Sequence, residues 1–145
     1  MAQEGLPVKI RLTTAICHGE STETFELIVF GRYYQKNESN YLIYNEVLEN
    51  GIVNTMVKWG EEEALIYRKG ILNMKLSFHL RGRKSGSYET ELGAFLLETV
   101  TDSLAFQWNE EEKSGYFDLK YKLFLEHTNV GTYHLSFDFK EDLKA

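Results

Sequence analysis

Four histidines are the side chains of this sequence best suited to bind a metal ion or to transfer a proton: His18, His79, His127 and His134. The last two flank an expected turn, so they are the pair that chain geometry brings closest. His127 is in register with the apolar, inward residues of its strand, whereas His134 alternates with the inward residues of the next one. The two side chains are therefore expected to face apart, and the sequence predicts surface histidines rather than a metal site.

The short motifs of the common nucleophilic, phosphate-binding and zinc-binding enzymes are missing from this chain. There is no Gly-x-Ser-x-Gly, no glycine-rich loop ahead of Lys-Ser/Thr, and no His-Glu-x-x-His. Cys17 is the single cysteine, so it can form neither an internal disulfide nor a cysteine metal cluster. The glutamate runs 61–63 and 110–112 are expected at exposed hairpin tips, too solvated to serve as acid catalysts. The sequence favours a non-enzymatic protein with no catalytic residue, metal or cofactor.

Five residues remain as candidates for contact with a ligand. Arg81, Arg83 and Lys84 form the one concentrated positive segment, and its glycines would let backbone N–H groups approach a carboxylate or phosphate. The alternative interpretation of this segment is a solvated hairpin tip whose charges aid solubility. Arg68 and Tyr88 are the arginine and tyrosine that could meet a ligand carboxylate within the fold.

Whether Arg68 points inward is left open by the pattern around it. It alternates with Leu65 and Tyr67 and shares a face with Ala64 and Ile66, so either of two apolar faces could be the core. An inward Arg68 must be paired or hydrogen-bonded, because an isolated buried charge is costly. The sequence is therefore compatible with two roles for Arg68: contact with a ligand, or a structural position at the rim of the barrel.

Apolar residues alternate with polar ones along most of the chain, which is typical of half-buried antiparallel strands. Asn50-Gly51 predicts a type I′ hairpin turn, Gly31 predicts a bend or bulge, and residues 81–86 predict a polar loop. The expected strand-like stretches are 8–16, 22–36, 40–48, 52–59, 63–69, 71–80, 88–92, 94–101, 103–109, 117–125 and 133–139.

These roughly ten strands follow one another without a helical crossover, so a meander of hairpins is the simplest topology. Closing the meander removes its exposed edges. The fold predicted is all-β: a single antiparallel up-and-down β-barrel of about 8–10 strands. One domain is expected over residues 1–145, with an ordered core at about 7–140 and frayed ends.

The formal net charge of −6 opposes binding to nucleic acid or to an anionic membrane surface. Residues 1–5 carry neither a basic nor an apolar leader segment, and no apolar run is long enough to span a membrane as a helix. We therefore expect a cytoplasmic protein.

Several segments taken together resemble a known family. They are Tyr67-Arg68-Lys69-Gly70, Met74 to Phe78, Tyr88 to Gly93 and the hairpin from Glu110 to Gly115. They are similar to the YwiB-like family of uncharacterised bacterial proteins, over roughly Val8 to Phe139. The resemblance implies a calycin (lipocalin-like) β-barrel and implies no activity, cofactor or catalytic residue.

Two functions are consistent with such a barrel. The first is non-enzymatic binding of a small apolar or amphipathic ligand inside it. The second is a protein-interaction or regulatory module that uses the outer surface and has no ligand cavity. Apolar residues on both faces of segments 27–30 and 41–44 support the second and also predict a homodimer.

Overall fold

The computed structural model describes residues 5–143 of the chain, and its elements are ten β-strands. The short chain ends that we expected to be frayed, 1–4 and 144–145, lie outside the described residues. The strands are β1 Leu6–His18, β2 Ser21–Lys36, β3 Ser39–Leu48, β4 Gly51–Trp59, β5 Glu63–Gly70, β6 Asn73–His79, β7 Arg83–Thr90, β8 Gly93–Asn109, β9 Ser114–Leu125 and β10 Thr128–Glu141.

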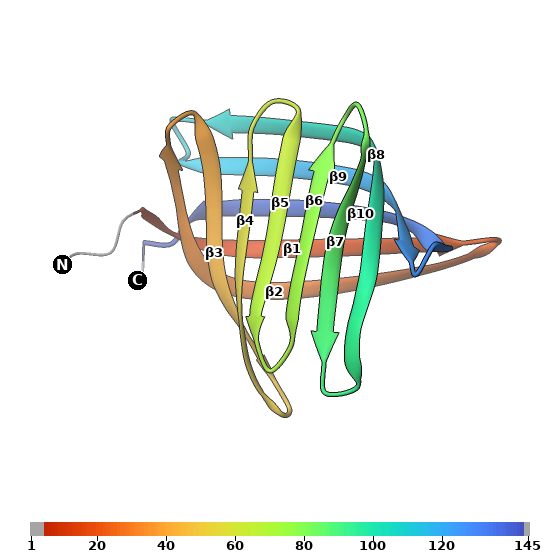
Figure 1. Ribbon diagram of the computed structural model, residues 1–145. Coiled ribbons are helices and arrows are strands. Elements are labelled where there is room, and N and C mark those ends of the chain that lie inside the picture. The colour runs from red at the N-terminus through yellow and green to blue at the C-terminus, as the bar shows by residue number, and fades with distance from the viewer. Residues whose placement is uncertain (1–4, 144–145) are drawn as a thin grey trace.

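Each strand pairs antiparallel with the next one in the chain, and β1 pairs with β10 to close the barrel. The predicted all-β, up-and-down barrel is therefore confirmed. Figure 1 shows that the wall has two layers. The strands β3 to β7 run steeply, whereas β1, β9 and β10 run across them, and the long strands β2 and β8 curve from one layer into the other.

Gly31 is the point at which β2 changes its neighbour. Strand β2 pairs with β1 up to Tyr33 and with β3 from Gly31 onward. A Cβ atom at position 31 would lie 2.2 Å from the carbonyl oxygen of Ile43, so only glycine allows the two backbones to come this close. The predicted bend is present, but both strand registers pass through Gly31 without a shift, so it is not a bulge.

The turns differ from the predicted ones. Strands β3 and β4 do form a hairpin, but Leu48 pairs with Gly51, and Asn50 does not have a positive φ. Positive φ values instead occur at Asn37 and Glu38 (52° and 67°) and at Glu126 and His127 (47° and 71°). Consecutive positive φ angles are typical of a type I′ turn, and these two turns lack the glycine by which the sequence would reveal them.

Several strand boundaries also differ from the predicted ones; β10, for example, begins at Thr128 rather than at 133. The stretches 94–101 and 103–109 belong to one strand, β8, whose register against β9 shifts between Thr101 and Ser103. A bulge interrupts the alternation of side chains without ending the strand, which is why it looks like a break in the sequence. The basic segment 81–86 is a loop only at its start, because β7 begins at Arg83.

Aromatic side chains fill the middle of the barrel. Trp59 stacks on Phe117 with ring centroids 4.3 Å apart, and Phe78 meets Tyr121 at 4.6 Å. Phe139 and Tyr33 continue the cluster toward one end of the barrel, with centroids 4.9 Å apart. The interior is therefore a packed core rather than an open channel, as expected for a small barrel filled by its own side chains.

Candidate functional site

Arg68 lies on the inner face of the barrel, which answers the question that its sequence pattern left open. Ala64 and Ile66, which share its face of β5, are both buried in the core, whereas Tyr67 is exposed. Arg68 is only partly covered, with 24% of its side chain exposed. The charge therefore sits inside the barrel wall but within reach of solvent.

A carboxylate satisfies this charge, as an inward arginine requires. Arg68 Nε donates to Glu46 Oε2 at 3.2 Å and Nη2 donates to Oε1 at 3.1 Å, a bidentate arrangement. The hydroxyl of the buried Thr55 donates to Glu46 Oε2 at 2.8 Å. Glu46 is itself largely covered, with 14% of its side chain exposed. These three residues form a fixed polar cluster.

Strand register explains why the cluster forms. Thr55 is opposite Tyr44 on one side and Arg68 on the other, and Glu46 follows Tyr44 on the same face of β3. Burial raises the pKa of the Tyr44 phenol strongly, and the nearby Glu46 carboxylate raises it further. Tyr44 is therefore a neutral phenol beside the ion pair at ordinary pH.

The same register extends from Arg68 across three more strands. Arg68 is opposite Met74, Met74 is opposite Tyr88, and Tyr88 is opposite Phe95. We call Tyr44, Thr55, Arg68, Met74, Tyr88 and Phe95 the Arg68 row. Its first two members are buried, and the four from Arg68 to Phe95 are half-buried. The row is thus polar at one end and apolar at the other.

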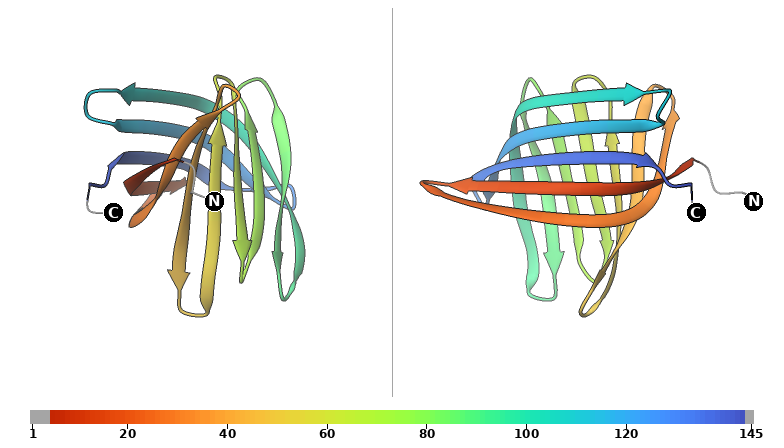
Figure 2. Two further views of the ribbon diagram at one scale, coloured as in Figure 1. Left: turned by 90° about the vertical axis from the view of Figure 1, so that its left-hand side faces the viewer. Right: turned by 180° about the vertical axis from the view of Figure 1, so that it is seen from behind.

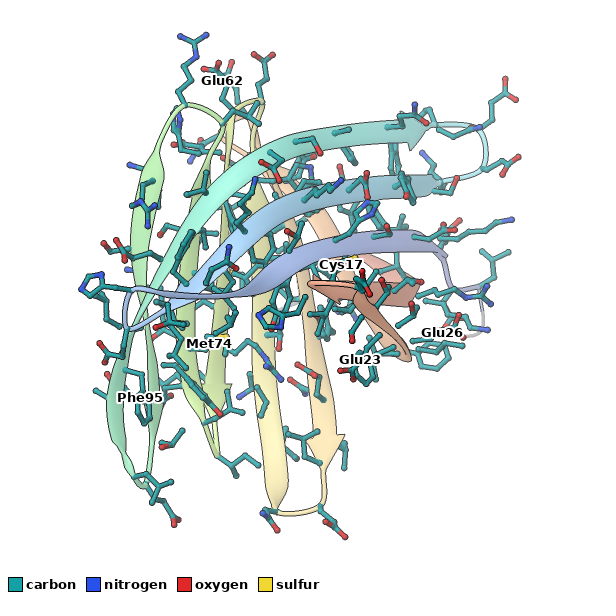
Figure 3. All side chains as sticks on the ribbon, turned by 90° about the vertical axis from the view of Figure 1, so that its right-hand side faces the viewer. Cys17, Glu23, Glu26, Glu62, Met74 and Phe95 are labelled. Atoms are coloured by element: carbon teal, nitrogen blue, oxygen red, sulfur yellow. The ribbon has the colours of Figure 1, made fainter. Side chains whose placement is uncertain are left out.

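The layer of crossing strands leaves this part of the inner face uncovered. In Figure 2 the steep strands extend well beyond the crossing strands at one end of the barrel. Figure 3, a side view, shows Met74 and Phe95 below β10, on the part of the steep strands that extends beyond the crossing ones. The Arg68 row is therefore a shelf that is open to solvent, not the floor of a closed cavity.

The three cations of the basic segment 81–86 do not form one patch. Arg81 Nη2 lies 3.0 Å from Glu62 Oε1 in the turn region. Arg83 Nη1 lies 3.7 Å from Glu98 Oε1, and its guanidinium sits over the ring of Phe124 at 4.5 Å. Lys84 lines a separate hollow. Of the five predicted ligand contacts, the structure brings only Tyr88 into the row that contains Arg68.

Sequence reasoning did not single out Glu46 or Thr55. Leu42, Tyr44, Glu46 and Leu48 occupy alternate positions of β3, so a charge stands in an inward series. That carboxylate on an inward position was the signal in the sequence. Only the strand register shows that Arg68 of β5 is its partner.

His127 does not share the inward face of β9 as predicted, because the strand ends at Leu125 and His127 lies in the exposed turn that follows. His134 points outward and contacts Asp118 at 2.5 Å, whereas His127 lies in a turn, 3.0 Å from Glu98. Ser136 also donates to Asp118, at 3.0 Å. Because the carboxylate stands between the hydroxyl and the imidazole, this trio lacks the order of a catalytic triad. No group of three or more metal-ligating side chains occurs within residues 5–143.

A large surface hollow lies away from these residues. It has a volume of about 880 Å³ and is lined by Trp108, Glu110, Tyr116 and their neighbours at the β8–β9 hairpin. None of the predicted ligand contacts borders it, and its charged lining residues are all acidic. We therefore do not take it as the site.

Comparison with known proteins places the chain in a family. The model of a domain of unknown function, DUF1934, matches residues 10–137. The chain belongs to the DUF1934 family. This DUF1934 barrel is 30% identical over 123 residues to the uncharacterised β-barrel protein YwiB of Bacillus subtilis (strain 168), covering 85% of this chain and 84% of that protein.

The fold of this DUF1934 protein also matches a solved structure. The crystal structure of YwiB from Bacillus subtilis superposes with a TM-score of 0.85 at 24% identity, covering 97% of this chain and 94% of that one. The resemblance inferred from the sequence is thus confirmed. Among residues 5–143, no helix of the DUF1934 barrel is long and apolar enough to cross a membrane.

Proposed function

We propose that this protein binds a small amphipathic carboxylate on the open inner face of the barrel, without catalysing a reaction on it. The observation that supports the proposal is the Arg68 row, which joins a partly exposed inward cation to three apolar, half-buried side chains. A carboxylate would contact Arg68, and the apolar part of the ligand would lie along Met74, Tyr88 and Phe95. Binding sites commonly combine apolar walls with a few convergent polar groups.

Arg68 retains the capacity to bind a second carboxylate. Within residues 5–143, Glu46 is its hydrogen-bond acceptor, and it engages Nε and Nη2. Nη1 donates to none of these residues, and a guanidinium can hold a carboxylate through two parallel N–H groups. Glu46 would hold the guanidinium in place while the ligand approaches from the open side.

The packed core limits how such a ligand can bind. The aromatic cluster around Trp59 occupies the middle of the barrel, so the ligand would rest on the shelf rather than enter a deep cavity. Less apolar surface is then removed from water than in an enclosed site, and affinity should be correspondingly modest. We expect dissociation constants in the micromolar to millimolar range.

Isothermal titration calorimetry with decanoate tests this function. Arg68→Met keeps an unbranched apolar stem but removes the guanidinium and its charge, and it should weaken binding about tenfold or more, since charged hydrogen bonds contribute about 1.5–3 kcal/mol. Arg81→Met is the matched control, because Arg81 is an exposed arginine paired with Glu62. Equal binding by both variants, or no binding by the unmodified protein, would contradict the proposal.

A second candidate function uses the outside of the barrel. Ile28 and Phe30 point outward from β2 with 44% and 62% of their surface exposed, and Ile43 on β3 is also exposed. Apolar side chains grouped on an outer face are typical of protein-interaction surfaces. We propose a second copy of this chain as their occupant, which makes the oligomeric state the test.

A further inference from the structure

The barrel wall is incomplete between β6 and β7. The two strands pair over Asn73 to Lys75, and the next backbone pairing on this side is the single bridge from His79 to Gly82, just before β7 begins. In between, Thr99 of β8 reaches past β7 and donates to the carbonyl oxygen of Ser77 at 2.5 Å. The first residues of β7 are therefore not paired with β6, and a hollow opens at this gap in the barrel wall.

Lysines and hydroxyl groups gather around this hollow, which has a volume of about 360 Å³. Its lining includes Lys58, Lys75, Lys84, Ser77, Ser85 and Leu65. Lys58 is opposite Leu65, and Leu65 is opposite Ser77, so these three form one row across β4, β5 and β6. Lys75 follows on the same face of β6, while Lys84 and Ser85 approach from β7.

The charge of the hollow is opposite to that of the protein. The whole chain carries −6, yet three lysines line the hollow against one carboxylate, Glu63. Within residues 5–143, none of the three lysines forms an ion pair, and Lys58 instead lies over the ring of Tyr41 at 5.6 Å. Three like charges with one carboxylate among them repel one another, and a bound anion would relieve that repulsion.

We propose that this hollow binds a small molecule carrying a phosphate group. Lysine ammonium groups bind phosphate as point charges, and serine hydroxyls donate to its oxygens. Three lysines and three serines, Ser39, Ser77 and Ser85, suit a group with several oxygens and more than one negative charge better than they suit a single carboxylate. The volume is that of a small-molecule site. The site is separate from the Arg68 shelf and does not depend on it.

Titration of the ¹⁵N-labelled protein with glycerol phosphate at constant ionic strength tests this site. We expect amide shifts of residues 75–77 and 84–85 to saturate, and the double variant Lys75→Gln/Lys84→Gln to weaken binding about tenfold. Both lysines are exposed, so this variant should keep its fold, which the unchanged dispersion of the spectrum would verify. Acetate at the same concentration is the comparison ligand and should bind more weakly.

A matched control distinguishes specific binding in the hollow from non-specific attraction of the anion to positive charge. Lys9 and Lys140 are exposed lysines opposite each other on β1 and β10, and Lys9→Gln/Lys140→Gln removes the same charge elsewhere. Binding that survives in this control but not in the hollow variant supports the proposal. Equal loss in both variants, equal binding of acetate, or no saturable shift would overturn it. Arg68→Met should leave this titration unchanged, which distinguishes the two sites.

Discussion

At the scale of single residues, the cluster of Arg68, Glu46 and Thr55 is the least expected feature of the barrel. A charge on an inward position loses hydration, and this loss is compensated here by a bidentate carboxylate and a hydroxyl. Removing either partner would leave the other without its counter-charge, at a cost to stability. The pair also presents a cation with unused N–H groups to solvent.

Glu46→Gln tests this interdependence. Removing the carboxylate leaves Arg68 without its counter-charge, and the free energy of unfolding should fall by about 1–3 kcal/mol because the site is partly solvated. The same change frees the guanidinium, so decanoate should bind more tightly. Urea denaturation measures the first effect and calorimetry the second. A variant as stable as the unmodified protein would contradict the account of the cluster.

Tyr33 makes the stability of the barrel sensitive to alkaline pH. Its hydroxyl donates to Asn40 Oδ1 at 2.6 Å, and burial raises the pKa of this phenol to about 12. The unfolded chain titrates near pKa 10, so the folded state holds the proton more tightly. This contribution to stability is complete below about pH 10 and is lost as the pH rises toward about 12.

The free energy of unfolding, measured by urea denaturation at a series of pH values, should therefore fall across that window. Tyr44 and Tyr121, whose pKa values burial also raises, act in the same direction. Tyr33→Phe removes one of these titrations and should make the decline less steep. An identical slope in the variant would show that Tyr33 does not contribute.

At the scale of strands, alternation predicted most of the fold. The inward series Phe117 to Leu125 and Tyr133 to Phe139 follow the predicted parity, because a strand with one buried face leaves a period of two in the sequence. The same argument did not detect the bulge of β8 or the separation of β7 from β6. Both features depend on the register and pairing between neighbouring strands, and the alternation within a single strand does not reveal either.

Gly31→Ala tests the close approach of β2 and β3. The added methyl group would lie 2.2 Å from a backbone oxygen, so one strand must move, and we expect a loss of about 1–3 kcal/mol in the free energy of unfolding. Gly60→Ala is the control, because a Cβ there meets nothing within 4 Å. Thermal unfolding followed by circular dichroism compares them. Equal stability of the two variants would contradict the proposed role of Gly31.

At the scale of the whole molecule, the crossing of two strand layers determines where a ligand could bind. The crossing strands cover one end of the steep strands and leave the other end open (Figure 1). Which end stays open depends on strand lengths and on the curvature of β2 and β8. The sequence could therefore identify Arg68 and Tyr88 as candidates but could not place them on an uncovered face.

The outer surface leads to a prediction about assembly. If Ile28, Phe30 and Ile43 meet a second copy of the chain, light scattering should give a particle of twice 16.9 kDa at high concentration. Phe30→Gln should shift the particle to the monomer mass without changing the circular dichroism spectrum. Exposed Leu92→Gln, in the β7–β8 turn, is the control. A monomer at all concentrations would rule out the dimer.

The most direct test of the central claim is to locate bound decanoate by isotope-edited NMR on the methyl group of Met74 and the rings of Tyr88 and Phe95. Our account predicts intermolecular contacts from the alkyl chain to these three side chains, and their loss in Arg68→Met while that variant remains folded. Contacts at the outer apolar residues Ile28 and Phe30 instead, or none at all, would contradict binding on the Arg68 row.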